Sequence, residues 1–116
     1  MIQIKRVYMQ YSKEDGYRIL VDRLWPRGLS KDKAHVDEWL KDIAPTDELR
    51  KWFNHEPEKY PEFRKKYEHE LQDHKALLEE ISKKAAHERV TLVYGAKDEE
   101  HNQAVVLAEV LNRKHH

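Results

Sequence analysis

The chain has 116 residues, the length of one domain built around a single core. Its 22 basic and 22 acidic residues give a formal net charge of zero, which disfavours general nucleic-acid binding because such proteins normally carry a basic excess. The absence of cysteine excludes disulfides, thiolate catalysis and zinc-thiolate sites.

The expected location is the cytoplasm. The first residues lack the long apolar core of a signal peptide, and no stretch approaches the ~18 consecutive apolar residues of a membrane span. We therefore expect no membrane partner. His115 and His116 are either native or the remnant of a purification tag, and no prediction depends on them.

Two strands are predicted near the N-terminus. Residues 2–8 alternate imperfectly between apolar and polar positions, as a half-exposed strand does. Ser12 and Asp15 have the spacing of a weak capping box, and Asp15 followed by Gly16 is a turn signal. Residues 17–21 end in three consecutive apolar side chains, which indicates a strand covered on both faces, the pattern of a parallel sheet.

Three helices are predicted in the middle of the chain. The first begins at Ser30 and ends at Pro45, and its apolar residues have helical spacing: Val36, Trp39, Leu40 and Ile43. Thr46 is predicted to cap a second, short helix that runs to Phe53. The apolar positions between residues 63 and 85 recur at intervals of three, four and seven, which predicts a single amphipathic helix of about 24 residues.

A strand and a helix are predicted last. Residues 89–94 are β-branched and aromatic, which is typical of a central strand. A buried helix is expected over residues 99–111, with Asp98 as its N-cap. The order of elements predicts an α/β fold: a small, mostly parallel sheet of three to four strands flanked by helices, forming a single compact domain over residues 1–116.

Two polar loops follow the two buried strands. If these strands pair in parallel through a right-handed crossover, loops 23–28 and 95–98 leave the same edge of the sheet, where open α/β sheets bind ligands. A simple turn usually contains Gly, Asn, Asp or Ser. Residues 22–28 instead contain arginine and tryptophan, which bind planar anions and stack on rings.

The predicted partner is a small anionic ligand, phosphorylated or nucleotide-like. Its candidate binding residues come from both loops: Arg23, Trp25, Arg27, Lys97 and Asn102. The candidates for proton transfer are Asp22 and His101, the latter because histidine titrates near neutrality. No phosphate-binding glycine motif supports ATP or NAD use, so the cofactor stays unknown. No recognised ligand spacing supports a metal site.

Other interpretations stay open. Asp22 pairs with Arg23 or Lys97 and Trp25 covers the core if the loop is only structural. The two predicted helices before and after Pro45 resemble a helix-turn-helix, but the acidic start of the second would face phosphates, so nucleic acid is an unlikely partner. A protein partner bound by the long helix is a third reading. The sequence decides neither enzymatic activity nor oligomeric state.

Five segments carry a family resemblance through their order and spacing: Asp22-Arg23-Leu24-Trp25-Pro26-Arg27-Gly28, Asp37-Glu38-Trp39-Leu40, Ala44-Pro45, Leu49-Arg50-Lys51-Trp52-Phe53 and Asp98-Glu99-Glu100-His101-Asn102. Over almost its whole length the chain resembles the YeaO-like proteins, a bacterial family of small cytoplasmic domains of unknown function. The resemblance implies a compact α/β domain and no established activity. More distant relatives often carry cysteine after the strand that corresponds to residues 89–94. Here Tyr94 and Gly95 stand there, so cysteine chemistry does not transfer.

Overall fold

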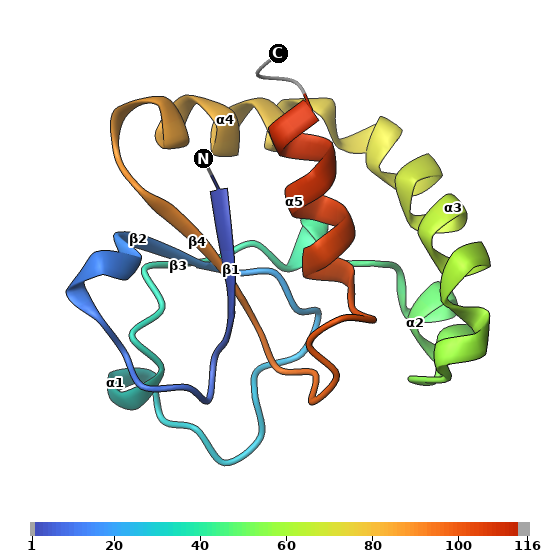
Figure 1. Ribbon diagram of the computed structural model, residues 1–116, viewed down its shortest axis with the longest axis horizontal. Coiled ribbons are helices and arrows are strands. Elements are labelled where there is room, and N and C mark those ends of the chain that lie inside the picture. Colours follow the sequence, from blue (N-terminus) through green and yellow to red (C-terminus); the bar gives the residue numbers. More distant parts are fainter. Residues whose placement is uncertain (1, 114–116) are drawn as a thin grey trace.

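A four-stranded parallel sheet organises the computed structural model, which describes residues 2–113 (Figure 1). Its strands lie in the order β1-β4-β2-β3. Their bounds are Ile2–Arg6 for β1, Tyr17–Leu20 for β2, Glu38–Trp39 for β3 and Val90–Tyr94 for β4. The register of β2 and β4, in which Ile19 lies beside Leu92, confirms their predicted parallel pairing.

Within residues 2–113, five α-helices surround the sheet. They are α1 (Lys31–Ala34), α2 (Asp47–Phe53), α3 (Tyr60–Leu71), α4 (Lys75–His87) and α5 (Gln103–Arg113). Short 3-10 turns are η1 (Lys13–Asp15), η2 (Lys41–Ile43), η3 (Pro57–Lys59) and η4 (Gln72–His74). No helix within residues 2–113 has the length and apolar character needed to cross a membrane. The α/β class and the four parallel strands agree with the prediction.

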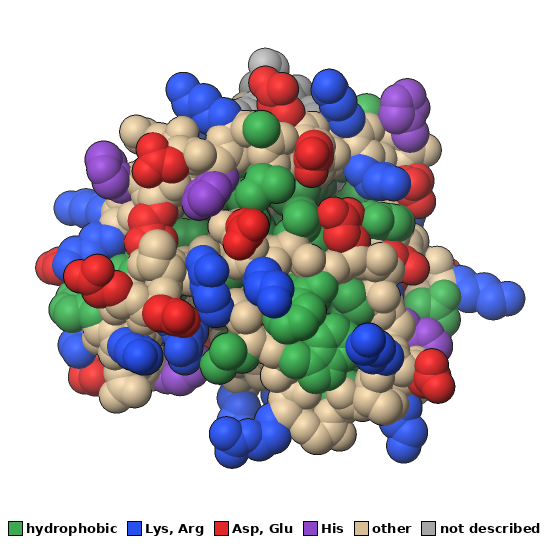
Figure 2. Space-filling view, turned by 180° about the vertical axis from the view of Figure 1, so that it is seen from behind, with side chains coloured by type: hydrophobic (Ala, Val, Ile, Leu, Met, Phe, Trp, Pro, Cys, Tyr) green, Lys and Arg blue, Asp and Glu red, His purple; other side chains and the backbone are tan. Residues whose placement is uncertain are grey.

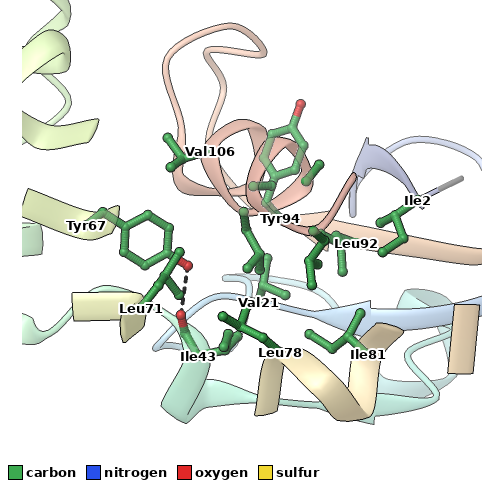
Figure 3. Close-up of a cluster of buried hydrophobic side chains, with 14 of the residues drawn as sticks. Ile2, Val21, Ile43, Tyr67, Leu71, Leu78, Ile81, Leu92, Tyr94 and Val106 are labelled. Atoms are coloured by element: carbon green, nitrogen blue, oxygen red, sulfur yellow. Dashed lines mark hydrogen bonds between the residues drawn. The ribbon is translucent and has the colours of Figure 1, made fainter. Parts of the chain in front are cut away.

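The sheet is covered on both faces, as its continuous apolar strands predict. Alternate residues of β4, among them Leu92 and Tyr94, join the main core with α2, α3, α4 and α5 (Figure 3). Within this core the Tyr67 hydroxyl donates to the carbonyl of Ile43 at 2.7 Å. On the opposite face Leu20 and Val93 join a smaller cluster, which α1 and the segment after β2 cover.

The surface mixes charges of both signs. On the face in Figure 2, lysine and arginine side chains alternate with aspartate and glutamate around patches of hydrophobic side chains. A protein that binds the nucleic-acid backbone usually presents one basic face. The mixed charge on this face therefore agrees with the zero formal net charge of the sequence.

The helix predicted from Ser30 to Pro45 is correct only at its start. Ser30 caps α1, with its hydroxyl accepting from the amide of Lys33, but α1 already ends at Ala34. The chain leaves α1 at His35, whose φ of 49° is left-handed. It then runs beside β2 as β3, with the amide of Leu40 donating to the carbonyl of Leu20 at 3.0 Å. The open edge of β2 supplies backbone hydrogen bonds that the apolar spacing did not reveal. Without a helix over residues 36–43, the helix-turn-helix interpretation loses its first helix.

The single long helix predicted around residues 63–85 is also wrong. It is two helices, α3 and α4, which meet at η4 and point in different directions (Figure 1). Leu71 and Leu78 of the apolar stripe are seven positions apart, and Gln72–His74 between them offer no apolar side chain for packing. The bend lets α3 pack on α2 and α5 while α4 packs on β4.

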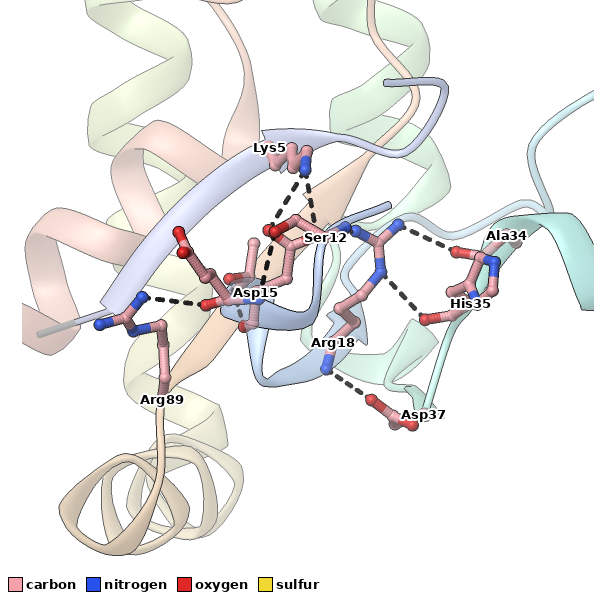
Figure 4. A network of polar contacts seen from close by, with 10 residues as sticks. Lys5, Ser12, Asp15, Arg18, Ala34, His35, Asp37 and Arg89 are labelled. Carbon is pink, nitrogen blue, oxygen red and sulfur yellow. Dashed lines mark hydrogen bonds and ion pairs between the residues drawn. The ribbon is translucent and has the colours of Figure 1, made fainter. Parts of the chain in front are cut away.

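A buried ion pair on the smaller-core face fixes the start of β2 (Figure 4). Arg18 is only 1% exposed, and its Nη1 lies 2.6 Å from Oδ2 of Asp15. The same guanidinium donates to the carbonyls of Ala34 and His35, both at 2.9 Å. Lys5 also binds Asp15, at 3.1 Å. This network holds β1, η1, β2 and the end of α1 together.

Candidate functional site

A cavity of about 600 Å³ lies at the carboxyl edge of the sheet, where the loops after β2 and β4 meet. In Figure 1 both loops lie at the lower edge of the molecule. The cavity walls include every predicted site residue: Asp22, Arg23, Trp25, Arg27, Lys97, His101 and Asn102. The volume is in the range of small-molecule sites, roughly 300–1,000 Å³. The structure thus brings together the two loops that the predicted strand pairing placed at one edge.

Asp22 links three elements around this cavity. Its Oδ2 accepts a hydrogen bond from the amide of Gly95 at 2.8 Å, and its Oδ1 accepts one from Nε2 of Gln103. Its own carbonyl accepts from the indole of Trp39 at 2.7 Å. Among the described residues Asp22 forms no ion pair with Arg23 or Lys97, the partners proposed for a structural loop. It joins the ends of β2 and β4 to the start of α5.

The environment of Asp22 disfavours its charge. Burial raises the pKa of its carboxyl to about 6, although hydrogen bonds from Gly95 and Gln103 and the nearby His55 favour the ionised form. Burial outweighs these partners because no cation within residues 2–113 forms an ion pair with Asp22. Asp22 therefore changes its charge within about one pH unit of neutrality.

The stability of the protein should depend on the charge of Asp22. The folded carboxyl has a pKa of about 6 against 3.8 for an ordinary aspartate, so the folded state holds this proton more tightly than the unfolded state. The stability that the protonated Asp22 contributes is fully present below about pH 4 and is lost as the pH rises through 6. We expect wild type to lose on the order of 2–3 kcal/mol relative to Asp22→Asn between pH 4 and 7. Urea unfolding of both proteins across this range measures the difference. Parallel stability curves would rule out the effect.

Arg23 and Trp25 are both tied to the backbone of the protein. Nε of Arg23 donates to the carbonyl of Pro45 at 3.2 Å, and one Nη donates to Ala44 at 3.0 Å. The indole of Trp25 donates to the carbonyl of Leu29 at 2.6 Å and its ring meets Trp39 edge to face. These contacts orient the loop. They leave Arg23 as a positive charge and Trp25 as an apolar surface in the cavity wall.

Arg27 and Lys97 face solvent at the rim of the cavity. Both are exposed, and within residues 2–113 neither side chain forms a hydrogen bond or an ion pair. Their backbones are nevertheless held in place. The carbonyl of Arg27 accepts from the hydroxyl of Tyr8 at 2.8 Å, and Arg6 fixes the neighbouring loop through the carbonyl of Ala96, also at 2.8 Å. Two uncommitted cations are therefore presented on anchored loops.

The turn before α5 differs from its predicted structure. The helix begins at Gln103 rather than near residue 99, and Oδ1 of Asn102 accepts from the amide of Val105 at 3.1 Å as its cap. Asp98 instead accepts from the amides of Glu100 and His101 and lies 2.8 Å from Nδ1 of His101. Those bonds, with the Glu100 amide foremost, hold the pKa of the Asp98 carboxyl below its usual value. Asn102 is only 1% exposed, and both of its side-chain hydrogen bonds are to the backbone of this turn and helix.

Sequence reasoning missed several parts of the cavity wall. Gln103 reaches Asp22 from the first turn of α5, and Arg50 and His55 come from α2 and the turn after it. Two aromatic rings of the main core, Phe53 and Phe63, stack with centroids 4.4 Å apart and form an apolar wall. The second wall was hidden because α2 and α3 lie far from both loops in sequence, and only packing brings them together.

The charges of the wall favour a negative ligand. Four basic side chains line the cavity: Arg23, Arg27, Arg50 and Lys97. Two acids accompany them, Asp22 and Asp98. Among residues 2–113 no three histidine, aspartate or glutamate side chains are grouped as metal ligands. The arrangement combines an excess of positive charge with an aromatic surface, which suits an anion that carries a ring.

Comparisons with a family model and with individual proteins place the chain in the same family. The DUF488-N3i model, described as the inactive DUF488-N3 subclade, matches residues 1–116. The uncharacterized protein YeaO of Escherichia coli is 47% identical over 110 residues, covering 95% of this chain and 96% of that protein. An uncharacterized protein of Mycobacterium tuberculosis is 42% identical over 111 residues, covering 96% and 93%. No solved structure matches significantly. The similarity to YeaO confirms the resemblance that the sequence motifs indicate.

Proposed function

The chain belongs to the inactive DUF488-N3 subclade. We propose that it binds a small anionic molecule, phosphorylated or nucleotide-like, at the carboxyl edge of its sheet. The observation that carries this proposal is the pair of uncommitted cations, Arg27 and Lys97, at the rim of an aromatic-walled cavity. A ligand anion gains charge-assisted hydrogen bonds there without breaking existing contacts of these side chains.

The anchored residues support the same proposal. Arg23 adds positive charge but keeps its bonds to Ala44 and Pro45, so the loop need not rearrange when a ligand enters. Arg50 adds a further cation, which forms an exposed ion pair with Asp47 at 3.2 Å. Such exposed pairs contribute little to stability, so Arg50 exchanges Asp47 for a ligand anion at a small free-energy cost. Pre-organised walls of this kind favour binding.

The test is a titration at the rim. Isothermal calorimetry with orthophosphate and with guanosine 5′-monophosphate, at low ionic strength, compares wild type with the double variant Arg27→Ala/Lys97→Ala. We expect the double variant to lose at least about tenfold in affinity for both probes, because each charge-assisted hydrogen bond contributes about 1.5–3 kcal/mol. The loss should shrink as salt is added.

A matched control separates the rim from general electrostatics. Lys13 and Lys31 are exposed and lie outside the cavity, so Lys13→Ala/Lys31→Ala removes the same charge elsewhere. The control should bind like wild type. Equal losses in the two double variants would reject a local anion site, and so would a wild type that binds neither probe.

The description of the family as inactive favours binding without turnover, so proton transfer by Asp22 and His101 lies outside the proposal. Nucleic acid stays the less favoured partner, since the charge of the chain is balanced and the predicted helix-turn-helix lacks its first helix. A cytoplasmic location stays the expectation from sequence.

A further inference from the structure

Asp22 is an unexpected residue for an anion site. It lines the cavity, and each of its two carboxylate oxygens accepts one hydrogen bond, from Gly95 or from Gln103. A carboxylate has about four acceptor positions, so each oxygen keeps capacity for another donor. Within residues 2–113 Asp22 has no ion-pair partner. A negative charge thus borders a cavity whose other charges are mostly positive.

The fold keeps space for this carboxylate. A Cβ atom added at Gly95 would lie 2.9 Å from Oδ2 of Asp22, too close for the present position of the side chain. A residue other than glycine at position 95 would therefore displace the carboxylate. The close approach allows the short bond from the Gly95 amide, which aligns the carboxylate at the end of β4.

A purely structural role does not require the charge. An asparagine has nearly the same shape, and it accepts from the Gly95 amide while a reoriented Gln103 accepts from its NH₂ group. The ionised carboxylate also suffers from burial, which raises the pKa of Asp22 to about 6. A ligand that carried only negative charge would be repelled by it as well. The acid is explained if the ligand itself brings a donor.

We propose that the ligand presents N–H donors to Asp22 in addition to the anionic group that Arg27 and Lys97 bind. This inference rests on the proposed function and adds the group of the ligand that Asp22 recognises. Two kinds of molecule share the chemistry: a nucleobase joined to a phosphate, and an aminoalkyl phosphate. The cavity of about 600 Å³ and the wall formed by Phe53 and Phe63 leave room for a ring, which favours the nucleobase.

Three probes test the proposal at pH 8, where Asp22 is ionised. Orthophosphate carries no N–H donor, phosphoethanolamine carries an ammonium group, and guanosine 5′-monophosphate carries ring and exocyclic N–H groups. In Asp22→Asn we expect at least a tenfold loss of affinity for one N–H probe, because a charge-assisted bond becomes a neutral one or is lost. Affinity for orthophosphate should stay the same or rise, because a repulsive charge is removed. The probe that loses affinity identifies the source of the donor.

A second variant guards against misfolding of the first. Gly95→Ala keeps the charge of Asp22 but displaces its carboxylate, so it should weaken the same N–H probe while sparing orthophosphate. Thermal unfolding verifies that each variant is folded. If Asp22→Asn does not fold, Gly95→Ala alone decides the matter by the same two affinities.

The outcomes separate this inference from the proposed function. One outcome is that Arg27→Ala/Lys97→Ala weakens the binding of all three probes while neither Asp22→Asn nor Gly95→Ala changes the order of their affinities. In that case the anion site is supported and recognition of N–H donors by Asp22 is rejected. The same rejection follows if wild type binds orthophosphate as tightly as both N–H probes. If wild type binds none of the three, the anion site and this inference fail together.

Discussion

Arg18→Met is expected to lower the free energy of unfolding by about 3–5 kcal/mol, the usual effect of breaking a buried ion pair. The substitution keeps the aliphatic stem but removes the guanidinium that lies 2.6 Å from Asp15. It also leaves the carbonyls of Ala34 and His35 without their donor. Lys5 stays beside Asp15 and offsets part of the lost attraction, so the loss should lie toward the lower end of this range. Urea unfolding at pH 7 measures the change.

The matched control for Arg18 is Arg89→Met. Arg89 donates to the carbonyl of Glu14 at 3.0 Å and so anchors the same turn, but it is exposed. Exposed polar contacts contribute up to about 1 kcal/mol, and this variant should change stability by no more than that. Similar losses in the two variants would mean that burial of Arg18 is unimportant and that the contact to the turn decides stability.

Gly16→Ala is expected to destabilise the fold by about 2–6 kcal/mol through two additive effects. Gly16 has φ 68° and ψ −135°, a conformation that side chains rarely adopt and that adds about 1–3 kcal/mol of strain. An added Cβ would also lie 2.2 Å from the carbonyl oxygen of Arg89, which accepts the first backbone hydrogen bond of β2. Overpacking against backbone adds about 1–3 kcal/mol. Thermal or urea unfolding gives the total.

Gly28→Ala isolates the strain from the clash. Gly28 has φ 76°, but an added Cβ there would meet no atom within 4 Å. Its substitution should therefore be destabilising by about 1–2 kcal/mol, the effect of the backbone conformation alone. The clash at Gly16 predicts a clearly larger loss for Gly16→Ala. Equal losses at the two glycines would show that the strand pairing adjusts freely around residue 89.

Local chemistry predicted the parts of the fold that depend on near neighbours in sequence. Thr46 caps α2, with its hydroxyl accepting from the amide of Leu49 at 3.2 Å, and Ser12 with Asp15 forms the expected capping box. The continuous apolar character of β2 and β4 predicted their burial on both faces, and hence their parallel pairing. That pairing alone was enough to predict where the two site loops meet.

The errors arise where distant contacts decide. β3 has two residues, too few for strand alternation to be visible, and it forms because the edge of β2 is free. The bend at η4 contains neither proline nor glycine, so only the packing of α3 and α4 on different partners explains it. The fully buried Arg18 has no sequence signal, because its partners include two backbone carbonyls. The Phe53 wall of the cavity was missed for the same reason.

The position of β4 has a consequence for the order of events during synthesis. β4 is the only strand that pairs with β1, it also pairs with β2, and it is the last of the described strands to be made. At about 5–20 residues per second, roughly 4–15 s separate the appearance of residue 20 from that of residue 94 on the ribosome. Through that interval β1 and β2 have no central partner. The sheet can therefore be completed only after residue 94 has been made.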